Sequence, residues 1–177
     1  MSSDRTTLPR ITRTGQPGAD IEHQLRTLLP MTRAIVAMHV RTDPARFAVA
    51  GEMDPVYEEA IRGTFAAETG RQVRVWMAEL PTPEGGWLAA GYAMAELCEQ
   101  DLLTLSPRCI YIHDVYIDPA HRSRGIGRAL IAACREWAAQ ERISTLRLIT
   151  MSGNGAARES FTRHGFRPST VELVMPV

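Results

Sequence analysis

The segment that most constrains this chain is IDPAHRSRGIG, residues 117–127, in which a strand ends and a helix begins. Apolar side chains then recur at Ile126, Leu130, Ala133 and Trp137, at spacings of four, three and four residues. Those spacings place all four on one face of an α-helix, and such a face is typically buried. The segment therefore predicts a strand, a turn and an amphipathic helix with one buried face.

The turn before this helix has the features of an anion site. Gly125 and Gly127 let a ligand approach the backbone closely, and the first N–H groups of a helix lack intrahelical partners. The positive end of the helix dipole and the side chains of Arg122 and Arg124 add favourable charge for a pyrophosphate. The simpler alternative is a helix that begins at flexible glycines, beside arginines that are exposed to solvent and bind no ligand. Neither the P-loop spacing nor GxGxxG is present, so neither nucleotide fingerprint applies.

The first half of the chain predicts helices. A short strand is expected around Ile11, and Asp20 is placed to cap a helix with an apolar face. Pro30 is expected to interrupt that helix. Asp54 followed by a proline indicates the start of a second helix, and Gly70 indicates its end.

The second half of the chain alternates strands with helices. Strands predicted at residues 73–80 and 87–98 form an antiparallel hairpin through the PTPEGG connection. The remaining elements are a strand at about 108–117, a helix at about 126–142, a strand at 145–151, a helix at 154–164 and a strand near 171–175. This order predicts one α/β domain with a mixed, mostly antiparallel sheet.

Composition narrows the class of protein. The 177 residues carry 20 basic and 20 acidic side chains, so no overall field favours nucleic acid or an anionic membrane. Cys98, Cys109 and Cys134 lack CxxC spacing, which argues against a disulfide framework and a zinc site. The N-terminus lacks the apolar core of a signal peptide, and no apolar stretch is long enough to span a bilayer. We therefore expect a soluble cytoplasmic protein without metal, nucleic-acid partner or membrane association.

Two motifs closely resemble those of the GNAT superfamily of N-acetyltransferases. The first is [Q/R]-x-x-G-x-[G/A] after a strand and a Val/Ile-x-Pro turn, matched here by RSRGIG (122–127) after IDP (117–119). The second is Asn-x-x-Ala, then an aromatic residue, then Gly-Phe; NGAA (154–157), Phe161 and GF (165–166) match it. Both motifs occur in the family's order and in matching predicted elements.

The resemblance implies a single acetyltransferase domain over residues 1–177, whose central strands splay apart between flanking helices. Residues 73–177 would form the cofactor-binding core, and residues 11–70 an N-terminal strand and the helices on the substrate side. The implied reaction moves the acetyl group of acetyl-CoA to a primary amine of a small molecule or peptide by direct attack, without a metal. Family habit favours a homodimer.

The resemblance also implies which residues hold acetyl-CoA. The pantetheine arm inserts between the splayed strands and pairs with the backbone of the strand at 111–117, while the pyrophosphate binds N–H groups at the helix start. The implied cofactor-binding residues are Val115, Tyr116, Ile117, Arg122, Ser123, Arg124, Gly125, Ile126, Gly127, Arg128, Asn154, Ala157 and Phe161. For Asn154, a plain N-cap of the helix that follows is the simpler role.

Phe161 departs from the family pattern. Many relatives place a tyrosine there, and its hydroxyl is usually assigned as the acid that protonates the leaving thiolate. A phenylalanine cannot donate a proton, so three alternatives remain: water protonates the thiolate, Tyr116 substitutes, or turnover is weak. The last alternative describes an acyl-CoA-binding sensor or regulatory module with weak or no turnover.

The base that deprotonates the amine is equally open. In the similar diamine acetyltransferases a glutamate aligns with His113 and an aspartate with Asp114, and a histidine titrates near neutral pH. A packing role for His113 is the alternative. Tyr111 shares the His113 face of the strand and is a second candidate, and Glu96 on the preceding strand is a third. Strand alternation predicts that Asp114 points to the opposite face.

Acidic residues crowd the start of the second predicted helix. They would attract a cationic amine, although acids in a first helical turn also interact favourably with the helix dipole, which is the stronger explanation. Aminoglycosides, polyamines, amino acids and protein N-termini all remain open as acceptors. The acidic residues are Glu52, Asp54, Glu58 and Glu59.

Overall fold

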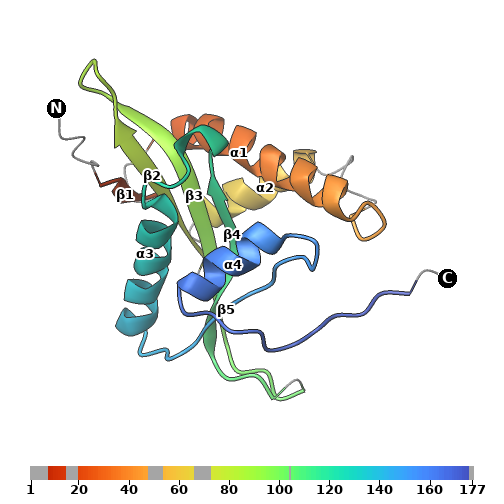
Figure 1. Ribbon diagram of the computed structural model, residues 1–177. Coiled ribbons are helices and arrows are strands. Elements are labelled where there is room, and N and C mark those ends of the chain that lie inside the picture. Colours follow the sequence, from red (N-terminus) through yellow and green to blue (C-terminus); the bar gives the residue numbers. More distant parts are fainter. Residues whose placement is uncertain (1–7, 15–19, 48–53, 66–72, 104, 176–177) are drawn as a thin grey trace.

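A computed structural model of the chain describes residues 8–14, 20–47, 54–65, 73–103 and 105–175. These residues form a five-stranded sheet in the order β1-β2-β3-β4-β5 (Figure 1). The first four strands are antiparallel to their neighbours, and β5 pairs with β4 in parallel. The strands are β1 (Arg10–Arg13), β2 (Val73–Pro81), β3 (Trp87–Cys98), β4 (Cys109–Ile117) and β5 (Leu146–Leu148).

Helices cover both faces of the sheet, and each face has its own apolar core. On one face Leu130 and Trp137 of α3 are buried against the strands. On the other face Leu25 and Leu28 of α1 pack around Tyr92 of β3. No helix in the described ranges is both long and apolar enough to cross a membrane. The helices are α1 (Ile21–Thr42), α2 (Asp54–Phe65), the 3-10 turn η2 (Pro119–His121), α3 (Ile126–Gln140) and α4 (Gly155–Arg163).

The expected start of α1 is confirmed, but the expected interruption at Pro30 is wrong. The Asp20 carboxylate accepts a hydrogen bond from the His23 N–H at 2.9 Å, as an N-cap does. Helix α1 then continues without a break through Pro30. A proline inside a helix costs about 3 kcal/mol. Buried side chains before and after it, including Leu28 and Ile35, anchor one continuous face on the sheet and offset that cost.

Most of the remaining elements occur where the sequence predicts them. The β2–β3 hairpin closes through a hydrogen bond of 3.0 Å from the Thr82 N–H to the Gly86 carbonyl, with Gly85 at a φ of 85°. Strand β1 includes Ile11, and α2 begins at Asp54. The expected end of α2 at Gly70 lies outside the described residues.

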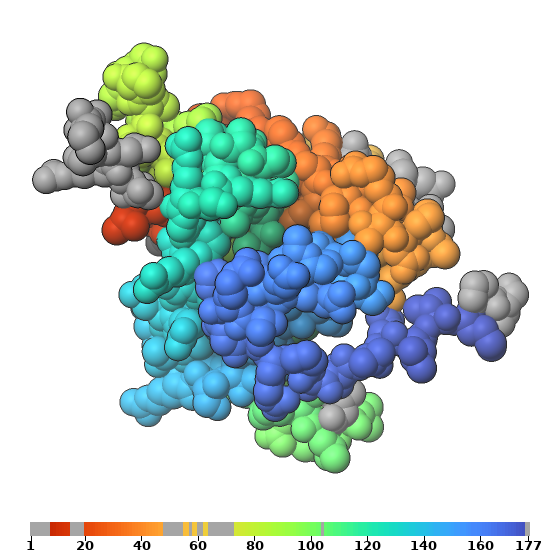
Figure 2. Space-filling view, viewed as in Figure 1, coloured from red at the N-terminus to blue at the C-terminus, as the bar shows by residue number. Residues whose placement is uncertain are grey.

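The strand expected near residues 171–175 is absent from the structure. This segment is extended but pairs with no strand in the described part of the chain, and the side chains of Val171 and Leu173 are 85% and 90% exposed. Figures 1 and 2 show it running outward past α4. Alternating apolar residues favour a strand only where a neighbouring strand offers a free edge at the right place. The segment is instead attached through an ion pair of 2.6 Å between Arg46 and Glu172.

The central strands splay, as expected. Parallel pairing between β4 and β5 covers only three positions and ends at Ile112 and Leu148. Strand β4 continues for five more residues, to Ile117, and is paired there only with β3 among the described strands. The second half of β4 therefore offers unpaired backbone groups on the side away from β3.

Candidate functional site

A β-bulge at His113 organises the centre of the sheet. Ala95 of β3 faces Ile112, but the next β3 residue in the ladder, Met94, faces Asp114. His113 is therefore the extra residue on β4, opposite no single residue of β3. A bulge re-aims side chains and bends its strand, so it accounts both for the splay from β5 and for the altered alternation beyond it.

The His113 side chain lies on the face of the sheet that α1 covers. Its Nε2 is 2.9 Å from Oε2 of Glu96, and its ring meets that of Tyr111 edge-on with 4.9 Å between centroids. Burial raises the pKa of Tyr111, so this phenol stays protonated at neutral pH. The structure thus brings together all three residues that the sequence nominated as bases.

The expectation that Asp114 points away from His113 is wrong. Met94 and Tyr92, two positions apart on β3, pack in the core under α1, and Asp114 faces Met94. The Tyr92 hydroxyl donates a 3.0 Å hydrogen bond to Oδ2 of Asp114. The bulge shifts the alternation by one residue, so His113 and Asp114 share a face. Burial raises the pKa of Asp114, and the hydrogen bond from Tyr92 opposes part of that rise.

Tyr116 follows on the same face of β4. Its ring stacks with that of Tyr92 at 6.2 Å between centroids, in the core under α1. Burial, followed by the nearby carboxylate of Asp118, raises the pKa of Tyr116. At neutral pH its hydroxyl is therefore a proton donor.

The turn before α3 has free backbone donors. Gly125 is the N-cap, with a φ of 77°, and no side chain caps the helix. The first helical hydrogen bond runs from the Ala129 N–H to the Gly125 carbonyl, so the N–H groups of residues 126–128 have no partner within the helix. A Cβ added at Gly125 would meet nothing within 4 Å, so the space in front of the turn is open.

Charged groups surround these donors. Arg122, Arg124 and Arg128 are exposed, and Ser123 takes a φ of 62° to complete the turn. The His121 Nδ1 is buried and has no hydrogen-bond partner among the described residues. Free N–H groups, a helix N-terminus and exposed guanidinium groups fit the phosphates of a CoA molecule.

Gly127 packs closely against the end of β4. A Cβ there would lie 3.1 Å from Cδ1 of Ile117 and 3.8 Å from His164 Nε2. Gly127 therefore allows α3 to approach the end of β4 closely. The tight contact holds the turn directly beyond Val115, Tyr116 and Ile117, the β4 positions expected to bind pantetheine.

Helix α4 lies across the splayed strands (Figure 1). The Asn154 Oδ1 accepts a 3.2 Å hydrogen bond from the Ala157 N–H, so the N-cap role of Asn154 is confirmed. The Phe161 ring packs edge-on against Phe166 at 5.7 Å and against the core on the α3 side. Figure 2 shows a recess in the surface between α1, α4 and the turn before α3.

Among the acidic residues at the start of α2, Glu58 takes part in ion pairs, whereas Glu59 is exposed. Glu58 pairs with Arg62 at 2.9 Å, and Arg62 also pairs with Glu22 of α1. These ion pairs join the two helices and favour a structural role for Glu58. Glu52 lies outside the described residues, and the side chain of Asp54 is not described.

Gly91 allows β3 and β4 to approach closely at the site, and it was not identified from the sequence. A Cβ at Gly91 of β3 would lie 2.5 Å from the Tyr116 carbonyl oxygen, so only glycine fits there. A glycine inside a predicted strand signals a close backbone approach. That signal was present in the sequence, at the position that faces Ile117.

Comparisons with known proteins agree with this geometry. Residues 41–166 match the family model described as the acetyltransferase (GNAT) family. No curated protein matches the chain in sequence. Among solved structures, the aminoglycoside N-acetyltransferase AAC(6')-Iy with a bisubstrate analogue of CoA and acetylneamine is 16% identical, with a TM-score of 0.65 over 97% of this chain and 99% of that one. A predicted acetyltransferase with acetyl-CoA from Clostridium acetobutylicum is 15% identical, with a TM-score of 0.64 over 96% of each chain. At such identities the likeness concerns the fold.

Proposed function

Because the chain belongs to the GNAT family of acetyltransferases, we propose that it moves the acetyl group of acetyl-CoA to a primary amine of a small molecule or peptide. The observation that carries this proposal is the arrangement along β4. A strand edge that pairs with no described strand and a helix start without a side-chain cap at Gly125 lie at one end, and a hydrogen-bonded histidine lies in the bulge. One strand thus joins a site for a phosphate-bearing thioester to a group that can accept a proton.

The chain holds acetyl-CoA, in this proposal, by three sets of groups. Backbone groups of Val115, Tyr116 and Ile117 pair with the pantetheine arm, because that part of β4 is free on the β5 side. N–H groups and side chains of the turn before α3 bind the pyrophosphate. The turn residues are Arg122, Ser123, Arg124, Gly125, Ile126, Gly127 and Arg128. Asn154, Ala157 and Phe161 complete the site from α4, where Asn154 also caps the helix.

The chemistry assigned to the chain is a direct transfer. The amine nitrogen forms a bond to the acetyl carbon while the carbon–sulfur bond of the thioester breaks. His113 accepts the proton that the amine loses, and Tyr116 donates a proton to the departing thiolate in place of the tyrosine that Phe161 replaces. Burial raises the pKa of Tyr111, so its phenol stays uncharged at neutral pH. We assign it the role of packing against the His113 ring. Proton transfers of this kind contribute roughly 10²–10⁴-fold each to rate.

The wider organisation follows from the same proposal. We assign residues 73–177 to the cofactor-binding core and residues 11–70 to the acceptor side, within one domain. The exposed apolar side chains of the C-terminal segment, such as Leu173 and Met175, support a homodimer in which a second copy covers them. Free thiols at Cys98, Cys109 and Cys134 are compatible with a cytoplasmic enzyme.

A ligand panel read by thermal unfolding tests the cofactor assignment. A ligand present at about 100 times its dissociation constant stabilises the folded state by roughly 2.7 kcal/mol. Acetyl-CoA and CoA should raise the unfolding temperature, whereas ATP and NAD at equal concentration should leave it unchanged. Stabilisation by ATP or NAD without stabilisation by acetyl-CoA would contradict the assignment.

A further inference from the structure

The contact between Glu96 and His113 goes beyond the base assigned above. Glu96 stands on β3 and His113 in the bulge of β4, and their side chains meet at 2.9 Å between Oε2 and Nε2. We propose that Glu96 is a positioning residue, whose carboxylate accepts the Nε2–H of His113 and so leaves the Nδ1 lone pair to take the proton of the amine. The inference rests on the proposed function and deepens it by naming the group that orients the base.

Relative exposure decides which of the two residues meets the acceptor. The side chain of His113 is 37% exposed and that of Glu96 is 17% exposed. The more accessible group is the one that an incoming amine reaches first. Glu96 stands on β3 directly opposite Tyr111, in a regular stretch of the ladder, so strand pairing fixes the position of its backbone. The His113 imidazole, in the bulge, lies beside the Glu96 carboxylate.

Hydrogen-bonding chemistry supports the same division of roles. A carboxylate accepts hydrogen bonds and donates none, so its contact with Nε2 places the imidazole proton there and fixes the tautomer. The edge-on contact with Tyr111 at 4.9 Å limits rotation of the ring. One hydrogen bond and one ring contact thus hold the His113 imidazole in a single orientation, which general-base catalysis needs.

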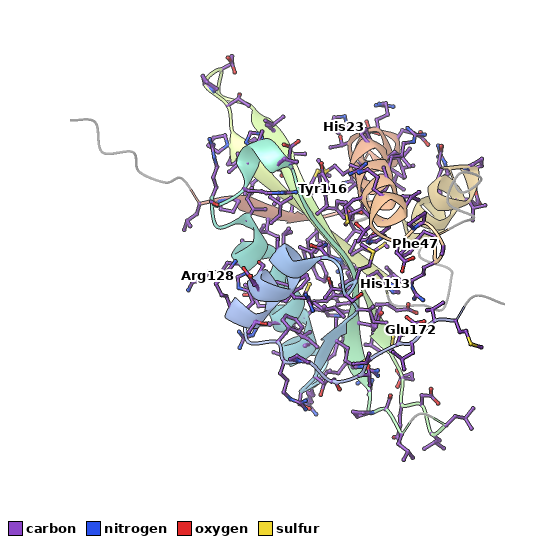
Figure 3. All side chains as sticks on the ribbon, turned by 45° about the vertical axis from the view of Figure 1, so that its right-hand side comes forward. His23, Phe47, His113, Tyr116, Arg128 and Glu172 are labelled. Atoms are coloured by element: carbon purple, nitrogen blue, oxygen red, sulfur yellow. The ribbon has the colours of Figure 1, made fainter. Side chains whose placement is uncertain are left out.

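The other charged groups near this pair have different partners. Asp114 is buried and accepts a hydrogen bond from Tyr92; that bond and the nearby His113 and His39 oppose the rise of its pKa that burial causes. His39 itself stacks on Phe47 at 4.9 Å. Figure 3 shows Phe47 and His113 at the same end of the molecule, where α1 ends. The hydrogen bond of Asp114 is to Tyr92, whereas Glu96 is the carboxylate within hydrogen-bond distance of the His113 imidazole.

A double-mutant cycle tests the proposal in the full chain. Glu96→Gln keeps the shape but can donate as well as accept, so it no longer fixes the tautomer. We expect this change to lower kcat by a smaller factor than the roughly 10²–10⁴-fold expected for His113→Ala, because a mis-set tautomer weakens a base without removing it. The double variant should match His113→Ala alone, since Glu96 acts only through His113. The KM for acetyl-CoA should stay within about 2-fold, as it does for a group outside the cofactor site.

Glu99→Gln is the matched control. Glu99 follows the end of the same strand, is exposed and pairs with Arg108 at 3.3 Å, away from His113. Its replacement should leave kcat unchanged. If the loss of kcat in the double variant equals the product of the losses in Glu96→Gln and His113→Ala, the proposal is overturned. Wild-type kcat in Glu96→Gln would overturn it as well.

Nitrogen NMR of labelled histidine gives a readout that needs no turnover. In the wild-type protein the His113 imidazole should carry its proton on Nε2 when neutral, and in Glu96→Gln it should distribute between the two nitrogens. A proton on Nδ1 in the wild type would overturn the proposal. If the wild type shows the Nε2 tautomer but no amine is acetylated, the orientation by Glu96 stands and the proposed function fails, so the two failures are distinguishable.

Discussion

At the scale of single residues, the β4 bulge has more influence than any motif. It moves Asp114 into the core beside Tyr92, onto the same face as Tyr111 and His113. Strand alternation alone placed Asp114 on the other face, because alternation assumes an uninterrupted ladder. The shared face of Tyr111 and His113 was therefore predictable from the sequence, but the orientation of Asp114 was not, since a bulge depends on contacts with the neighbouring strand.

Replacing His113 by alanine tests the base. The change should lower kcat by roughly 10²–10⁴-fold, because it removes a general base, with little change in the binding of acetyl-CoA. Steady-state kinetics at neutral pH and a titration with CoA measure the two effects. His23→Ala is the matched control, since Figure 3 shows His23 on α1 at a distance from His113. An unchanged kcat in His113→Ala would remove this residue from the mechanism.

Asp114 should make stability depend on pH. Burial raises its pKa in the folded state above the ordinary value of 3.8, so the folded protein binds this proton more tightly than the unfolded chain does. The contribution is therefore fully present below about pH 3.8 and is lost as the pH rises through the raised pKa. Asp114→Asn keeps the shape without the charge and should abolish this loss. Urea unfolding between pH 4 and pH 8 measures it; parallel pH profiles in both proteins would show that Asp114 is not responsible.

At the scale of elements, the turn between β4 and α3 follows from local rules. Gly125 at positive φ, a helix without a capping side chain and three exposed arginines were all predictable, because each depends on a few consecutive residues. The same holds for the caps at Asp20 and Asn154. The predictions at Pro30 and at 171–175 were wrong, because packing on the sheet decides whether α1 continues and a free sheet edge decides whether a strand forms.

Removing positive charge from the turn should weaken cofactor binding. We expect Arg122→Ala and Arg124→Ala each to raise the Kd for acetyl-CoA by about 10-fold, because each loses a charge-assisted contact with phosphate. The dependence of Kd on salt should also become shallower. Calorimetric titration at two salt concentrations measures both. Arg135→Ala, an exposed arginine farther along α3, should bind as the wild type does. Equal Kd values in all variants would refute the assignment of this turn.

Gly91 should tolerate no side chain. In Gly91→Ala the new Cβ would lie 2.5 Å from the Tyr116 carbonyl oxygen, so β3 and β4 must separate. We expect a loss of about 1–3 kcal/mol in the free energy of unfolding, as for overpacking in a core. Chemical denaturation measures it. Gly155→Ala is the control, because its Cβ would have no neighbour closer than 4.0 Å. Wild-type stability in Gly91→Ala would mean that the strands are less tightly held than the structure indicates.

At the scale of the whole molecule, the groups proposed to bind the cofactor and those proposed to bind the acceptor lie in different places, and β4 contributes to both. The turn before α3 and the free edge of β4 present the groups proposed to hold acetyl-CoA. The face under α1 presents Glu96, His113 and Tyr111, where the acceptor is proposed to bind (Figure 3). The sequence predicted the fold through two motifs and the order of elements. The acceptor follows from neither, because its site depends on how separate elements meet.

Amine-dependent release of CoA is the measurement that tests the central claim most directly. The wild-type protein, acetyl-CoA and a thiol reagent are combined with a library of polyamines, aminoglycosides, amino acids and peptides, and the acetylated amine is identified by mass. We predict that at least one primary amine accelerates CoA release above hydrolysis and that His113→Ala suppresses this acceleration. If acetyl-CoA stabilises the protein but no amine accelerates release, the chain binds acetyl-CoA without transferring its acetyl group, and the proposed transferase activity is contradicted.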